Sequence, residues 1–573
     1  MTARVPRCPS PPRSPDLAEL EKDPMSPLLH PDTILVNGKV TTLADGTSTP
    51  QEAEALAVTG DRIAAVGSTA QIQALAGPAT AVVDLGGRRV IPGLIDGHIH
   101  ALRAGRTWND ELRWENVYDL DEALAMVRAE AERQPAGTWI RVVGGWHDGQ
   151  FPQGRGPTRA ELDAAAPEHP VYVQTRYEYA QLNTLAMQRM ALDDEVVARV
   201  EAEAKRTAGV GHFERDETGA LTGRGFGIAL MSWFYRQLPA PTFEEQVAST
   251  AALSTEFARL GMTGVVDGGG VNSGPESYGA MYAAWRRGLL KTRIRLFKHA
   301  TQDGTEQADF AGYIRFEQPG FGDGILRVAG LGEVILWRSH DRFGISGDIS
   351  EGAEQEMRQI LADAAARGWT VQLHVHSDDF YDLALRVWEQ VHEQHPIDGL
   401  RWMMVHAEPV KVEDIPRFRR LGAGVSMQSL MRLSGEAAIA QWGQERIAAA
   451  PPVRALLDAG IPLALGSDAM RVANYNPFVS LEWFVTGLTV RGTETLRGEN
   501  LHTRLEALRG YTLQAAWSTF EEQDRGSLEP GKLADLAVLS ADYFDVPADR
   551  IHLITSDLTL LGGVTVWESG ALR

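Results

Sequence analysis

A long alternation of short apolar runs and amphipathic segments fills the middle of this 573-residue chain. The segments 351–367 and 379–393 repeat apolar residues at nearly the period of an α-helix. Apolar runs of strand length lie between such segments, at 263–267, 294–297, 371–374, 402–406 and 462–466. Because strand–helix alternation of this length builds parallel β/α units, it predicts an α/β fold with a (β/α)8 TIM barrel.

Both ends of the chain read differently from the middle. Short strands broken by turns are expected at 33–38, 55–58, 62–67 and 81–85, and again at 534–539, 551–554 and 563–567. Asn37-Gly38 is a strong hairpin signal. We therefore expect the two ends to pair into one small β-sandwich beside the barrel.

These zones give a provisional division of the chain. Residues 1–30, with Arg4, Arg7 and Arg13 and no long apolar run, are read as a mobile tail. The first part of the sandwich is expected at 31–90, the barrel at 91–500, and the final barrel helix with the rest of the sandwich at 501–573. Residues 107–240 exceed what the early barrel needs, so we expect an insertion over the active-site face.

Composition excludes several function classes. The formal net charge of −21 disfavours binding to nucleic acid through its phosphates. Cys8 is the sole cysteine, which rules out intramolecular disulfides and thiolate metal clusters, so any metal must be held by His and carboxylates. No apolar stretch of membrane-spanning length occurs, and a cytoplasmic location without a membrane partner is expected.

The sharpest local feature is the pair His98 and His100, which follows the apolar run 90–95. Side chains two residues apart on a strand point the same way. If this strand belongs to the barrel, both imidazoles face its carboxyl-terminal opening, where barrel enzymes place their chemistry. Two imidazoles on one face make half of a site for a borderline metal ion.

Further histidine and carboxylate residues end later apolar runs. His374 ends one run and is followed by His376, His406 ends another, and Asp468 follows the run 461–466. Parallel barrel strands bring their carboxyl ends together without closeness in sequence. Isolated, each could be a buried structural polar group, but the repeated placement favours a metal site.

Taken together, these segments resemble the amidohydrolase superfamily, in particular amidohydrolase family 3, the branch of N-substituted formamide deformylase and the YtcJ-like proteins. The similarity runs over nearly all of the chain after residue 32. Its motifs are Ile91-Pro-Gly-Leu-Ile-Asp-Gly-His-Ile-His100, Gly144-Gly-Trp146, His374-Val-His-Ser-Asp378, His406-Ala407, Gly466-Ser-Asp468, Asn476-Pro-Phe478 and Gly526-Ser-Leu-Glu-Pro-Gly-Lys-Leu-Ala-Asp-Leu536.

The resemblance implies a role for each matching residue. His98 and His100 would bind a first, more buried metal ion, and Asp468 would contact that ion and the attacking water. His374 and His406 would bind a second ion where one is present. His374 is preferred over His376 because its spacing to Asp378 matches the family.

One departure concerns the fourth barrel strand. Relatives often carry a carboxylated lysine there that bridges two metals, whereas this chain has Glu333. A glutamate supplies a bridging carboxylate directly, so Glu333 is predicted to bind metal. The alternative is a carboxylate that only orients a histidine beside a single ion. Lys298 lies on an earlier predicted strand and is a poor candidate for the bridge.

A second departure lies at Arg176-Tyr-Glu-Tyr179, where relatives commonly show a histidine upstream of the position matched by Asn183. This neighbourhood is expected to face the substrate. The predicted substrate-binding residues are Trp146, His147, Tyr177, Glu178, Trp337 and His376, with His340 also expected near the barrel opening.

The resulting hypothesis is hydrolysis of a non-peptide C–N bond, amide-like, in a small organic molecule by metal-activated water, with Asp468 moving the proton. Zinc is the expected metal, as one or two ions, and iron, manganese or nickel would fit similar ligands. Two alternatives stay open: a hydratase, lyase or deaminase reaction at the same site, and a non-catalytic regulatory or binding relative. A homo-oligomer, with a dimer favoured, is expected.

Overall fold

The computed structural model describes residues 30–44, 49, 51–206, 211–270 and 277–572, so the predicted tail at 1–30 lies almost wholly outside the described residues. Eight parallel strands form one sheet whose neighbours follow in chain order. They are β8 (Leu94–Ile99), β15 (Met262–Asp267), β16 (Arg293–Lys298), β17 (Leu326–Leu331), β18 (Thr370–Val375), β19 (Met403–His406), β20 (Gly424–Gln428) and β21 (Leu463–Gly466).

The first and last strands meet and close the barrel. The backbone N–H of Asp468 donates to the carbonyl of His98 over 2.9 Å, and the N–H of His100 donates to the carbonyl of Ala469, also over 2.9 Å. Three predicted metal ligands, His98, His100 and Asp468, therefore lie directly at the seam. The expected (β/α)8 barrel is confirmed.

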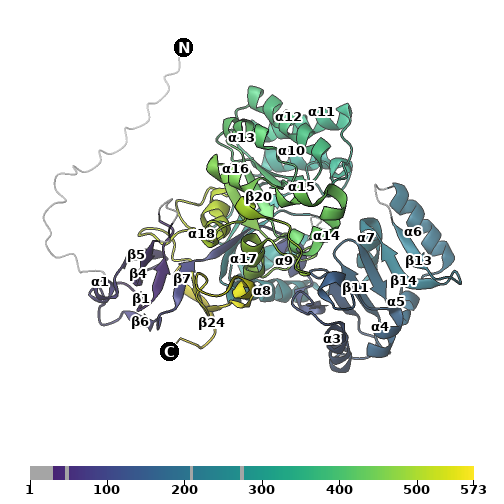
Figure 1. The fold of residues 1–573 in the computed structure, drawn as a ribbon, viewed down its shortest axis with the longest axis horizontal. Coiled ribbons are helices and arrows are strands. Elements are labelled where there is room, and N and C mark those ends of the chain that lie inside the picture. The colour runs from purple at the N-terminus through teal and green to yellow at the C-terminus, as the bar shows by residue number, and fades with distance from the viewer. Residues whose placement is uncertain (1–29, 45–48, 50, 207–210, 271–276, 573) are drawn as a thin grey trace, which may run out of the picture.

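Helices cover the outside of the barrel (Figure 1). They include α8 (Phe243–Arg259), α9 (Tyr278–Arg286), α10 (Glu306–Phe316), α11 (Glu351–Ala365), α12 (Asp378–Gln394), α13 (Ile415–Leu421), α14 (Met431–Trp442), α16 (Val453–Asp458), α17 (Pro477–Thr486) and α18 (Arg504–Arg509). In α12 the buried residues Phe380, Ala384, Val387 and Val391 recur every three or four positions, so one face packs inward.

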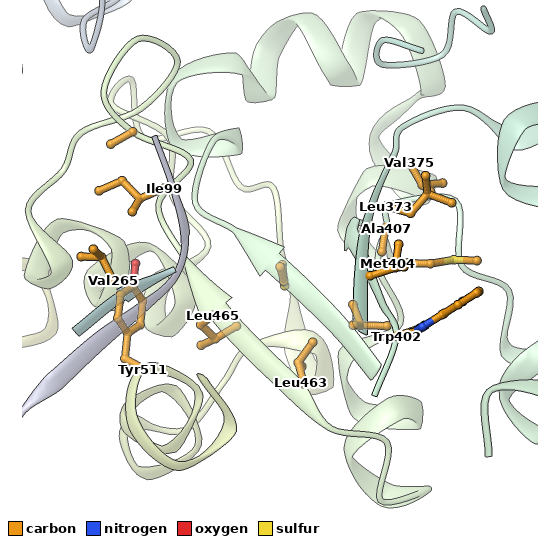
Figure 2. Close-up of a cluster of buried hydrophobic side chains, with 14 of the residues drawn as sticks. Ile99, Val265, Leu373, Val375, Trp402, Met404, Ala407, Leu463, Leu465 and Tyr511 are labelled. Carbon is orange, nitrogen blue, oxygen red and sulfur yellow. The ribbon is translucent and has the colours of Figure 1, made fainter. Parts of the chain in front are cut away.

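Alternation along β18 separates the core from the site. Leu373 and Val375 join the hydrophobic core, where they lie near Met404 of β19 (Figure 2). Gln372 and His374 point to the opposite face, because successive side chains on a strand alternate. The same strand thus supplies packing on one face and polar groups on the other.

Two sheets built from both ends of the chain form the small sandwich. One has the order β5 (Arg62–Gly67), β4 (Ala55–Thr59), β1 (Thr33–Val36) and β6 (Ala81–Asp84). The other has the order β24 (Val564–Glu568), β23 (Ser556–Leu561), β22 (Leu536–Leu539), β7 (Arg89–Pro92), β2 (Lys39–Thr41) and β3 (Glu52–Ala53). Antiparallel pairing of β7 with β22 joins the two ends, as predicted.

Two local predictions in the sandwich are wrong. Asn37-Gly38 does not make a hairpin: both edges of β1 are occupied by β4 and β6, so the turn carries the chain into the other sheet. Residues 551–554 are not a strand, because Ala548–Leu553 forms a 3-10 helix. Its buried Ile551 packs in the large barrel core instead of in a sheet.

A third sheet lies in the segment between β8 and β15. Its order is β13 (His212–Arg215), β14 (Leu221–Phe226), β12 (Tyr179–Leu182), β11 (Val171–Thr175), β10 (Ile140–Val143) and β9 (Glu111–Leu112). Helices α3 (Leu120–Arg133), α4 (Arg159–Ala165), α5 (Thr184–Arg189), α6 (Asp194–Arg206) and α7 (Ile228–Gln237) accompany it, and Figure 1 shows this unit to one side of the barrel. The limits 107–240 given above for an insertion remain a prediction.

Within the described part of the chain, every helix is too short or too polar to cross a membrane.

Candidate metal centre

The six predicted ligands converge at the carboxyl end of the barrel. His98 lies in β8, His374 in β18, and His406 ends β19, while Glu333 and Asp468 follow β17 and β21 by two residues. Glu333 lies at the middle of the group. Its Oε2 is 3.0 Å from Nδ1 of His374, 3.4 Å from Nε2 of His98 and 3.5 Å from Nε2 of His406. Its Oε1 is 3.6 Å from Nε2 of His100.

The outward nitrogens of two of these histidines meet fixed acceptors. Nδ1 of His98 lies 3.0 Å from Oε1 of Gln372, and Nδ1 of His100 lies 2.6 Å from the carbonyl oxygen of Gly269. When these Nδ1 atoms donate, the Nε2 atoms present lone pairs to the centre of the cluster. Nε2 of His98 is fully buried and has no hydrogen-bond partner. This orphaned atom, which faces two carboxylates, fits a metal cation.

The electrostatics of the cluster favour positive charge at its centre. Burial opposes ionisation of Glu333, but His98 and His374 outweigh it and hold the pKa of this carboxyl well below its usual range. Burial likewise disfavours a charged His98, yet Glu333 and Asp468 raise its pKa to about 9. Burial and the neighbouring His376 lower the pKa of His406 to about 4. The negative charges of Glu333 and Asp468 therefore favour a proton on a neighbouring histidine or a metal cation between the side chains.

Ring orientations distinguish His374 from His376. The rings of His374 and His406 are at 81° with centroids 4.6 Å apart, and Nδ1 of His374 lies 3.1 Å from Nε2 of His406. The rings of His376 and His406 are stacked at 8° with centroids 4.1 Å apart. Because the lone pair of an imidazole nitrogen lies in the ring plane, one ion can serve the first pair but not the stacked pair.

Two carboxylates that the sequence reading missed hold these histidines. Oδ2 of Asp341 accepts from the backbone N–H groups of His376 and Ser377 over 2.8 and 2.6 Å. Oε2 of Glu408 lies 2.8 Å from Nδ1 of His376. Glu408 lies in the turn that follows β19, where strand alternation no longer applies, so no periodicity marks it. Asp341 lies in a loop, where no periodicity marks it.

A cavity of about 310 Å³ opens above the candidate ligands. Its far wall comes from the turn between β11 and β12, which contributes Arg176, Tyr177 and Glu178. The guanidinium of Arg103, three residues beyond His100, donates to the hydroxyl of Tyr177 over 2.7 Å. His376 and His340 also line the cavity, and His340 stacks on His374 with centroids 4.3 Å apart.

Three residues predicted to bind substrate, Trp146, His147 and Trp337, do not line this cavity. Trp146 is fully buried against Trp114 and Phe151, and its indole N–H donates to the carbonyl of Gln174, so it belongs to a core. Trp337 donates to the carbonyl of Ala300 and does not line the cavity.

His147 lies behind the wall, with Nε2 3.8 Å from Oε2 of Glu178. Burial and the nearby Arg176 lower its pKa to about 4. Lys298, the weaker candidate for a bridge, is also absent from the ligand cluster. Its ammonium lies 4.1 Å from the ring centre of Tyr278 and donates to the hydroxyl of Tyr282 over 3.2 Å.

Comparison with known proteins places this centre in a family. The chain is 25% identical over 558 residues to N-substituted formamide deformylase of Arthrobacter pascens, covering 94% of this chain and 98% of that protein. The structure of an uncharacterized metal-dependent hydrolase from Pyrococcus furiosus matches with a TM-score of 0.63 at 21% identity, covering 90% of this chain and 100% of that one. Atrazine chlorohydrolase from Arthrobacter aurescens TC1, complexed with zinc, matches with a TM-score of 0.52 at 16% identity, covering 94% and 95%. The family model described as "Amidohydrolase family" matches residues 81–567, and the chain therefore belongs to the amidohydrolase family.

Proposed function

We propose that this protein is a metal-dependent hydrolase that cleaves an amide-like, non-peptide C–N bond of a small organic molecule. The observation that carries the proposal is the convergence of histidine nitrogens and carboxylate oxygens around Glu333 beneath the cavity. The likeness to an N-substituted formamide deformylase supports the bond class. A regulatory or binding role is disfavoured because the whole ligand set is present.

The ligands divide into two groups. Three sets of residues have ligand atoms within 4.8 Å of one another: His98, His100 and Asp468; His98, Glu333 and His406; and His374, His376 and His406. In the third set we exclude His376 because its ring is stacked on that of His406. We assign the first group to one ion, His374 and His406 to a second, and Glu333 to the position between them. Zinc suits imidazole and carboxylate ligands, and iron, manganese or nickel would also be accepted. A divalent ion held here would activate water and polarise a carbonyl oxygen.

Asp468 is the proposed proton carrier. Its Oδ1 lies 2.9 Å from Nε2 of His100, and it lines the cavity. Asp468 takes a proton from the attacking water as the oxygen–carbon bond forms, and passes it to the leaving nitrogen as the C–N bond breaks. The products are a carboxylic acid and an amine.

His376 is assigned to the substrate and not to the metal. Glu408 fixes its Nδ1, and the stacked arrangement on His406 keeps it outside the plane of that ligand. Its other nitrogen remains for a hydrogen bond within the cavity. Tyr177 and Glu178 face the same space from the opposite wall. A cytoplasmic location, a homodimer, and the absence of nucleic-acid and membrane partners remain proposals.

The test is replacement of Asp468 by Asn, assayed with a panel of N-substituted formamides and simple amides. General acid–base catalysis contributes roughly 10²–10⁴-fold, so turnover should fall by at least that factor. Metal content is measured on the same samples, to separate a lost proton carrier from a lost ion. Asp378→Asn is the control, because the half-buried Asp378 pairs with Arg446 and does not line the cavity. Full activity of D468N would contradict the mechanism.

A further inference from the structure

A second, larger hollow lies outside the metal cavity. It measures about 810 Å³ and is bounded by α6 and α7 on one side and by the loop between β17 and α11 on the other. We call it the outer chamber. Its lining includes Val200, Ala229, Trp233, Arg236, Trp337, Arg338, Ile345 and Asp348.

The outer chamber and the metal cavity share a boundary. Ile228, His340 and Arg342 line both spaces. Ile228 begins α7, and His340 stacks on the predicted ligand His374. Figure 1 shows α7 at the side of the β9–β14 unit that faces the barrel. A molecule in the outer chamber therefore meets the metal cavity at the side chains of these three residues.

The walls of the outer chamber present apolar surface. Ile345, which is 51% exposed on the tight turn closed by Arg342, contributes apolar surface to the chamber. Trp233 lies opposite and is only partly buried. The indole N–H of Trp337 donates a hydrogen bond to the carbonyl of Ala300. The polar atom of this side chain is therefore satisfied, and the rest of the ring offers apolar surface.

The charged side chains that line the chamber are those of Glu203, Arg236, Arg338, Arg342 and Asp348. Arg338 is paired with Asp348 over 3.1 Å and also contacts Glu356. Arg236 is exposed on the last turn of α7, where a basic residue interacts favourably with the helix dipole. Beside these charged groups, Trp233 and Ile345 provide the surfaces that an apolar substituent could contact.

We propose that the outer chamber binds the alkyl or aryl substituent of an elongated amide whose carbonyl lies at the metal ligands. This inference rests on the proposed function. The metal cavity holds the reacting group, and the substituent passes His340 and Arg342 into the chamber. Longer apolar substituents should then improve the specificity constant until the chamber is filled.

The experiment measures kcat/KM for two homologous series of increasing chain length, one N-alkylformamides and one straight-chain primary amides. The first places the chain on the nitrogen and the second on the carbonyl, so the series that responds identifies the side that enters the chamber. Each methylene that becomes buried should raise kcat/KM by up to about fourfold. A length-independent kcat/KM in both series would overturn the inference.

Two variants and a control locate the effect. Ile345→Ser removes exposed apolar surface, and Ala229→Phe fills part of the chamber; both should flatten the length dependence while sparing the shortest substrates. Phe316→Ser is the control, because Phe316 is 81% exposed on α10 and lies outside the chamber. Equal effects of I345S and A229F on all chain lengths would contradict the inference.

A binding measurement separates this inference from the proposed function. Calorimetric titration with the same series gives dissociation constants whether or not any amide is cleaved. If no compound is turned over, but affinity still rises with chain length and I345S removes that rise, the proposed function is wrong and the substituent site still holds. If affinity does not depend on length, the chamber is not a substituent site.

Discussion

The imidazole rings of His376 and His406 lie face to face, with centroids 4.1 Å apart and planes at 8°. An ion in the plane of one ring lies outside the plane of the other, so the two residues cannot share it in this arrangement. His374, at 81° to His406, can share it.

This relationship predicts different metal contents for two neighbouring alanine variants. His374→Ala should bind less metal than the wild type, because it removes a ligand. His376→Ala should keep the wild-type metal content and raise KM, because it removes a contact to the substrate. Elemental analysis of both purified proteins checks the prediction. Metal loss confined to H376A would reverse the assignment.

Glu333 should be essential for metal binding. Glu333→Gln keeps the shape of the side chain but removes the charge that four histidines surround. Metal content should therefore fall, and by about one ion per chain if Glu333 bridges two ions. Glu408→Gln is the matched control, since Glu408 contacts His376 and not the ligand cluster. If E333Q retains its full metal content, Glu333 only orients its neighbours.

The junction between barrel and sandwich depends on a buried ion pair. Nε and Nη2 of Arg293 in β16 donate to the two carboxylate oxygens of Asp535 over 2.7 and 2.9 Å. Asp535→Ala leaves this guanidinium buried without its carboxylate, which should cost about 3–5 kcal/mol. Glu244→Ala breaks the solvent-exposed pair with Arg287 and should cost much less, because water and salt screen exposed charges. Calorimetric unfolding compares the variants, and equal losses would refute the distinction.

Glu506 should make the free energy of unfolding depend on pH. Burial opposes its ionisation, but Arg454 and the cap of α18 at Thr503 outweigh burial and lower its pKa to about 2. Since this pKa lies below the unfolded value of about 4.3, the stabilisation is complete above the unfolded value and is lost as pH falls toward 2. The difference in melting temperature between wild type and Glu506→Gln should therefore shrink over that range. A difference that stays constant with pH would contradict this reading.

The convergence of the candidate ligands could be predicted from the sequence where strand periodicity and barrel topology act together. His98 and His100 share a face because strand side chains alternate, and parallel strands carry His374, His406 and Asp468 to the same end of the barrel. The barrel and the sandwich followed from the same patterns. These features depend on the spacing of residue types along the chain, which can be read from one amino-acid sequence.

Features set by tertiary contacts were not predicted. Asp341 acts through backbone N–H groups of a distant loop, and its own segment has no periodic pattern. Trp146 beside His147 suggested a pocket, but the sheet buries it against Trp114. Asn37-Gly38 is a typical hairpin turn sequence, but β1 already pairs with β4 and β6, so β2 cannot pair with it. In each case packing with remote residues overrides the local signal.

The central claim is that the cluster around Glu333 holds catalytic metal. Crystals of the protein prepared with zinc should be measured with X-rays at energies above and below the zinc edge. The account predicts an anomalous peak within ligand distance of Nε2 of His98, Nε2 of His100 and Asp468, and a second peak near Nδ1 of His374 and Nε2 of His406 if Glu333 bridges. No anomalous peak at the cluster in zinc-prepared crystals would contradict the account.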